Sequence, residues 1–107
     1  MTTYDQREQA FESAFVHDED LRFRAHARRD RSLGLWAAAL LGKSGKDADD
    51  YAATIVALGL ETTPDDAIKT RIIADFVKHG VHQSVEQITS TMAAMMKDAV
   101  QHIKMEP

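Results

Sequence analysis

DEDLRFRAHARRDRSLGLWAAALL, residues 18–41, is the stretch of sequence that decides the fold. Its second half places apolar side chains at the i, i+3, i+4, i+7 and i+8 spacing that forms one face of a helix. These residues are Leu33, Trp36, Ala37, Leu40 and Leu41. Its first half carries arginines directly after the acidic residues 18–20. We therefore expect one long helix whose second half is packed and whose first half is solvated or faces a partner.

Three later segments also carry helical signals. The first spans 47–60 and is expected to begin at an Asp47 cap. The second begins with Thr63 as cap and Pro64 at the first helical position, and Asp66 stands where a capping-box acid would be. The third runs from Ser84 to about residue 104 and begins with a Ser84–Gln87 capping box. The expected apolar faces are Tyr51, Ala52, Ile55, Val56 and Leu58; Ile68, Ile72, Ile73, Phe76 and Val77; and Val85, Ile88, Met92, Met95, Met96, Ala99, Val100 and Ile103.

No segment alternates apolar and polar residues for long enough to predict a strand. The loops between the expected helices are short, which favours antiparallel packing of neighbours. The fold class is therefore all-α, with a four-helix bundle over residues 18–107. Residues 1–17 form a separate N-terminal arm, mobile and partly helical, in which Phe11 and Phe15 share a helix face. These two side chains could equally join the core or anchor a partner.

The composition of the chain limits the classes of function that it can have. The chain of 107 residues has no cysteine and a net charge of −4, which argues against disulfides and against a nucleic-acid-binding protein. Residues 1–20 hold six acids and one arginine, a net charge of −5, so an acidic arm precedes the basic stretch. We find no secretory signal and no segment of the roughly 20 apolar residues that a membrane span needs. A cytoplasmic protein is expected.

Signals for catalysis or metal binding are few. His79 and His82 form an HxxH pair interrupted by Gly80, and with His102 they are interpreted as surface or loop histidines. The loop at residues 42–46, GKSGK, resembles the end of a phosphate-binding loop, but it follows a helix instead of a strand. No nucleophile stands beside a placed base. We expect neither an enzyme nor a bound cofactor or metal.

Five arginines lie within ten residues, with Asp30 among them: Arg22, Arg24, Arg28, Arg29 and Arg31. Pairing with acids one helical turn away would stabilise a solvated helix by roughly 0.2–0.5 kcal/mol per pair. The number of arginines exceeds what such pairing requires. A second interpretation is therefore contact with a protein partner or with an anionic ligand.

One family shares these features. The order YDQREQAFE at residues 4–12, Phe15, HDEDLRFR at 17–24, ARR at 27–29 and LGLWAA at 33–38 resembles the zeta-subunit family of alphaproteobacteria. That family comprises small inhibitors of the F-type ATP synthase. The resemblance covers essentially the whole chain and is most specific between Phe11 and Ala38.

The resemblance implies a four-helix bundle with a mobile inhibitory N-terminus. In such proteins the N-terminus becomes helical as it enters a catalytic α/β interface of the synthase head, where it also touches the γ stalk and blocks rotation. Carried onto this chain, the arm contacts would be Tyr4, Arg7, Phe11, Glu12 and Phe15. A collar at the mouth of the cleft would be formed by Arg22, Arg24, Arg28 and Arg29.

Two other functions remain open from the residues alone. A small helical module could bind a nucleotide or another anionic ligand through Arg28, Arg29, Arg31 or Lys43. The chain could also be a helical adaptor with an accessory role. Removing residues 1–17 distinguishes the inhibitor from the ligand-binding module, because only the inhibitor needs the arm.

Overall fold

The computed structural model describes residues 18–105, which form four α-helices and, within that range, no strand. The helices are α2 (Glu19–Leu40), α3 (Gly45–Leu58), α4 (Pro64–His79) and α5 (Val85–Met105). The prediction of an all-α, four-helix protein is confirmed. The predicted arm, residues 1–17, lies outside the described residues. Within the described range no helix is long and apolar enough to cross a membrane.

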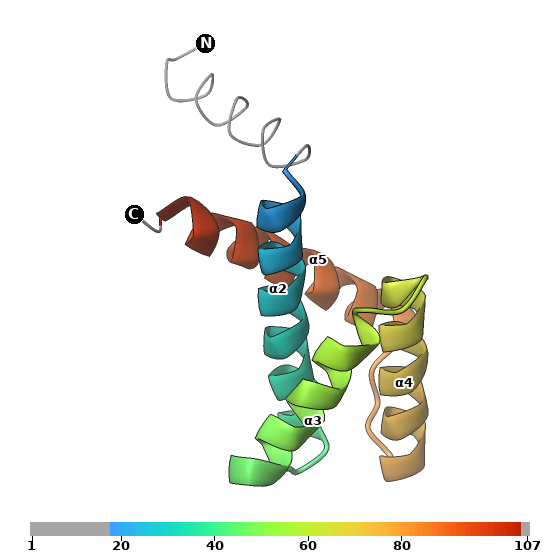
Figure 1. Cartoon of the computed structure of the whole chain (residues 1–107). Coiled ribbons are helices and arrows are strands. Elements are labelled where there is room, and N and C mark those ends of the chain that lie inside the picture. The colour runs from blue at the N-terminus through green and yellow to red at the C-terminus, as the bar shows by residue number, and fades with distance from the viewer. Residues whose placement is uncertain (1–17, 106–107) are drawn as a thin grey trace.

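The arrangement is only partly antiparallel (Figure 1). Helices α2, α3 and α4 run alternately down and up, whereas α5 crosses α2 at a steep angle. Helix α2 packs against both α3 and α5, and α4 contacts α3 and α5. The expectation that neighbouring helices pack antiparallel therefore holds for the first three helices and fails for the last. The long first helix organises the fold because it supports a partner on each of two sides.

Local capping interactions fix two of the helix starts. The Asp18 side chain accepts a hydrogen bond from the Leu21 N–H at 3.1 Å, which caps α2. At α5, the Ser84 hydroxyl accepts from the Gln87 N–H at 3.0 Å. In return the Ser84 N–H donates to the Gln87 side-chain oxygen at 2.7 Å. The predicted capping box at Ser84 is confirmed.

Two predicted helix caps differ from the structure. Helix α3 begins at Gly45, and its N-cap Ser44 lies three residues before the predicted cap Asp47. The Ser44 carbonyl already accepts a hydrogen bond from the Ala48 N–H, so helical bonding starts before Asp47. Helix α4 does begin after Thr63 with Pro64 in its first turn, but the Thr63 side chain makes no capping hydrogen bond. The capping box predicted with Asp66 therefore does not form.

Most of the predicted apolar faces meet in one core. Its buried members are Leu33, Ala37, Ala38, Tyr51, Ile55, Ile68, Ile72, Phe76, Ile88 and Met92. The rings of Trp36 and Phe76 meet edge to face, with centroids 5.8 Å apart. Three residues predicted for the apolar faces, Leu40, Val77 and Val85, are instead exposed. Their spacing places these residues with the apolar face of their helix, but the neighbouring helices leave them exposed.

A second, smaller cluster corrects the view of the first half of α2. Ala25 and Ile103 are buried together, and Leu21, Met96 and Val100 pack around them. The first half of α2 is therefore not wholly solvated, since one of its sides lies against the last turns of α5.

Gly34 lets α2 and α3 approach closely. A Cβ atom at residue 34 would lie 2.6 Å from the Ala52 Cα and 3.2 Å from the Ala52 Cβ. Both neighbouring atoms belong to or adjoin the backbone of α3, which cannot rotate away as a long side chain can. The expectation that another element packs against this interior glycine is confirmed.

Candidate partner-binding surface

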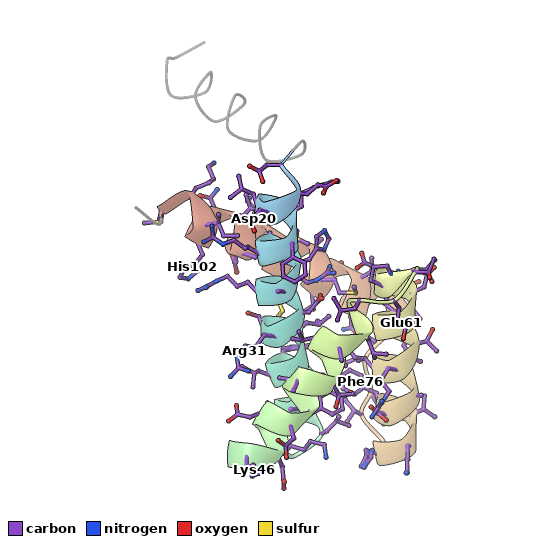
Figure 2. The ribbon with its side chains drawn as sticks, viewed as in Figure 1. Asp20, Arg31, Lys46, Glu61, Phe76 and His102 are labelled. Carbon is purple, nitrogen blue, oxygen red and sulfur yellow. The ribbon has the colours of Figure 1, made fainter. Side chains whose placement is uncertain are left out.

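The arginines of α2 divide between two sides of the helix. Arg24, Arg28 and Arg31 follow the i, i+4, i+7 spacing of one face, and all three side chains are exposed. Arg31 projects outward from α2 (Figure 2), and its guanidinium lies 3.5 Å from the Asp49 carboxylate of α3. Arg22 belongs to a different face, which it shares with Arg29 two turns later. Three of the predicted contact residues, Arg22, Arg24 and Arg28, are therefore exposed near the start of α2, on two of its sides.

Arg29 lies inside the protein. Its side chain is 3% exposed, its Nε donates to the Asp30 carboxylate at 2.7 Å, and its Nη2 donates to the Asp65 carboxylate at 2.6 Å. The second contact joins α2 to the first turn of α4. The assignment of Arg29 to an exposed collar is thus not supported by the free protein, because its charge is already used to hold two helices together.

Asp30 is the second buried charge, at 3% exposed. One of its carboxylate oxygens lies against Gly59, so closely that a Cβ atom at residue 59 would collide with it. Burial raises the pKa of Asp30, and this effect outweighs the lowering by the hydrogen bond and charge of Arg29. The pair therefore connects α2 to the end of α3 as well as to α4.

The raised pKa of Asp30 makes a pH-dependent contribution to stability. The unfolded chain releases this proton near the ordinary pKa of 3.8, whereas the folded protein holds it to higher pH. The contribution is therefore fully present below pH 3.8 and is lost as the pH rises through the folded-state pKa. We expect the wild-type protein to gain stability relative to Asp30→Asn as the pH falls from 7 to 4.

Urea unfolding of both proteins at matched pH values measures that difference. Asparagine keeps the shape of the side chain but cannot titrate, so any constant effect on Arg29 cancels in the comparison across pH. A difference in unfolding free energy that stays flat or shrinks on acidification would contradict the expected titration.

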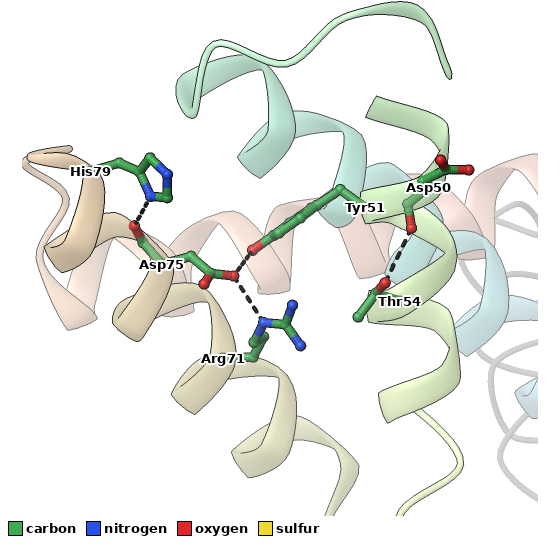
Figure 3. Close-up of polar contacts among 6 residues, drawn as sticks. All are labelled: Asp50, Tyr51, Thr54, Arg71, Asp75 and His79. Atoms are coloured by element: carbon green, nitrogen blue, oxygen red, sulfur yellow. Dashed lines mark hydrogen bonds and ion pairs between the residues drawn. The ribbon is translucent and has the colours of Figure 1, made fainter. Parts of the chain in front are cut away.

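A second cluster of polar side chains links α3 to α4 (Figure 3). The Tyr51 hydroxyl donates to the Asp75 carboxylate at 2.8 Å, and Arg71 Nε donates to the same oxygen at 2.9 Å. Burial and the neighbouring carboxylate raise the pKa of Tyr51 above its ordinary value. The Lys43 ammonium lies 5.9 Å from the centre of the Tyr51 ring. These contacts are structural, since every group in them already has a partner within the protein.

The three histidines of the second half of the chain do not converge on a metal site. His79, His82 and His102 are exposed, as interpreted from the sequence. The His79 Nδ1 is 2.9 Å from the Asp75 carbonyl oxygen (Figure 3). Among residues 18–105, no group of three or more His, Asp or Glu side chains could hold a metal ion.

Two exposed apolar residues near the start of α2 were not identified from the sequence. Phe23 is 60% exposed and Leu60, in the α3–α4 loop, is 75% exposed. With Ala27 and Val56 they line one small hollow of about 40 Å³, whose lining also includes His26, Asp30 and Gly59. We call Phe23, Ala27, Val56 and Leu60 the apolar patch. The one signal in the sequence was Phe23 itself, an aromatic residue between two arginines in a half-helix expected to be polar.

The predicted arm contacts Tyr4, Arg7, Phe11, Glu12 and Phe15 lie outside the described residues. Near the start of α2, the described residues 18–105 present exposed arginines beside the apolar patch. The helices that carry them are held together by the buried charges of Arg29 and Asp30. Exposed apolar side chains with a polar rim are typical of protein-binding surfaces. The fold and this surface are therefore those of a small helical binding protein.

A comparison with known protein families shows to which family within this class the chain belongs. The chain matches the family model described as ATPase inhibitor subunit zeta over residues 1–102, and it belongs to that family. The resemblance seen in the sequence is confirmed. A comparison with curated proteins found no match. The match includes residues 1–17, before α2, as well as nearly all of the four helices.

Proposed function

We propose that this protein inhibits ATP hydrolysis by the F-type ATP synthase of the same cell. Residues 1–17 become helical as they enter a catalytic α/β interface of the synthase head, where they also touch the γ stalk and block rotation. The protein acts from the cytoplasmic face and catalyses no reaction itself. The observation that carries this proposal is the family match over residues 1–102, in a family of ATPase inhibitor subunits.

The fold supports separate roles for the arm, which contacts the synthase head, and the bundle, which carries the arm. Among residues 18–105, α2 to α5 and the loops between them supply two hydrophobic clusters. The bundle therefore provides a folded base, and the arm supplies Tyr4, Arg7, Phe11, Glu12 and Phe15 as contacts. Arg22, Arg24 and Arg28 contact the mouth of the cleft. Arg29 does not contact the cleft itself but positions these three arginines by holding α2 against α4.

The alternative of a nucleotide-binding module has less support. Its four residues do not form one site, because Arg29 is bonded to Asp30 and Asp65 and Arg31 lies beside Asp49. Lys43 lies in the loop beyond the end of α2, which stops at Leu40, nine residues or about 13.5 Å along the helix after Arg31. Of the four, Arg28 and Arg31 share an exposed face of α2, and Arg31 already lies beside Asp49.

ATP hydrolysis by the matching synthase head tests the proposal. The head is titrated with the full chain and with a chain that begins at Asp18, whose fold is checked by circular dichroism. We expect inhibition by the full chain only. Equal inhibition by the shorter chain would place the inhibitory element in the bundle, and no inhibition by the full chain would overturn the proposed function.

A further inference from the structure

We propose that the apolar patch is a second, rigid contact with the synthase head, seated against an apolar surface at the mouth of the cleft that receives the arm. This inference rests on the proposed function and extends it from the arm to the bundle. The occupant of the patch is a protein surface whose apolar centre is bordered by carboxylates.

The first argument is exposure. Phe23 and Leu60 keep 60% and 75% of their surface accessible, although they line one hollow together with the half-buried Ala27 and Val56. A large side chain gains free energy when it leaves water. The free protein leaves this gain unused at two residues around one hollow, which is the expected form of a surface completed by a partner.

The second argument is position. Phe23 follows Asp18, the first residue after the arm, by only five residues, or about 7.5 Å along the helix axis. A cleft that takes in the arm as far as Phe15 therefore brings its rim up to this part of α2. The exposed Val77 and Val85 lack this proximity in sequence, because one lies in the last turn of α4 and the other at the start of α5.

The third argument is rigidity. The loop that carries Leu60 is held at both ends, by Asp30 against Gly59 and by the Arg29–Asp65 ion pair. Within the loop, the Leu60 N–H donates to the Ala57 carbonyl and the Glu61 N–H donates to the Leu58 carbonyl, both at 3.1 Å. A contact already fixed before binding loses little conformational freedom on association. The two buried charges thus position the patch, although neither can reach the partner.

The fourth argument is charge. Arg22 and Arg24 flank Phe23 in the sequence, and both side chains are exposed. A surface that accepts Phe23 must also accommodate these two cations. Carboxylates around an apolar centre supply that complementarity, and they would disfavour an acidic segment as a competitor for the surface.

The test uses the full chain with Phe23→Ser and Leu60→Ser together, in the same hydrolysis titration. Both side chains are exposed, so the fold should persist, and circular dichroism checks this. We expect the half-inhibitory concentration to rise by at least about tenfold, because two partly desolvated apolar side chains are lost. The matched control is Val77→Ser, which removes an equally exposed apolar side chain, 76% accessible, from α4 and should inhibit like the wild type.

Three results would overturn the inference while the wild-type chain still inhibits. Equal potency of the double variant and Val77→Ser would show that the patch makes no contact. Stronger inhibition by the double variant would show that the patch holds the arm back in the free chain. A wild-type dimer that becomes monomeric in the double variant, measured by light scattering with unchanged potency, would assign the patch to self-association. Failure of the wild-type chain to inhibit would instead overturn the proposed function itself.

Discussion

Replacing Arg29 by methionine is expected to lower the free energy of unfolding by about 3–5 kcal/mol, the usual cost of removing one member of a buried ion pair. Methionine fills much of the same space, but Asp30 then stays buried at 3% exposed without its charged partner. The Asp65 contact between α2 and α4 is lost as well. This single change should therefore weaken the attachment of α2 to α4, through Asp65, and to the end of α3, through Asp30.

The comparison with Arg28→Met separates this effect from a general effect of losing positive charge. Arg28 is the preceding residue and its side chain is exposed, so its replacement should change stability by no more than about 0.5 kcal/mol. Urea unfolding at pH 7 measures both variants. The loss in Arg29→Met should shrink at acidic pH, because a protonated Asp30 no longer needs the guanidinium. Equal stabilities of the two variants would mean that the Arg29 ion pairs do not hold the helices together.

Replacing both Phe11 and Phe15 by alanine is expected to raise the half-inhibitory concentration by about 10²–10⁴-fold. Burying one such side chain contributes roughly 1.5–3 kcal/mol, so the pair contributes roughly 3–6 kcal/mol, and each 1.4 kcal/mol is about a factor of ten in affinity. The contribution matters because ordering a disordered segment on binding costs about 2–5 kcal/mol. Without the two rings, the remaining contacts would barely offset that cost.

The same double variant decides the alternative that the sequence left open. If the two phenylalanines belong to the arm alone, the free energy of unfolding of Phe11→Ala with Phe15→Ala equals that of the wild type. A loss of several kcal/mol in urea unfolding would show instead that the rings are part of the core. Unchanged inhibition with unchanged stability would remove both residues from the proposed contact.

Helix positions could be read from the sequence because local interactions set them. The Asp18 cap and the Ser84–Gln87 capping box use groups only three residues apart, and Gly80 ends α4 with the positive φ of 70° that glycine adopts readily. The start of α3 was misplaced for the same kind of reason, because Ser44 and Asp47 are both plausible caps and only the backbone geometry selects one. The family pattern was likewise local, and the match over residues 1–102 confirmed it.

The sequence by itself determined an all-helical chain, the approximate limits of its helices, its membership of a family of inhibitor subunits and the apolar side of each helix. Only the tertiary structure decided which arginine is internal, since Arg28 and Arg29 differ by one residue but point to opposite environments. It also decided that Ala52 fills the space beside Gly34, and that Phe23 and Leu60, thirty-seven residues apart, share one hollow. The physical reason is that these properties depend on where two helices cross, and a crossing is set by contacts between distant segments that periodicity within one helix does not contain.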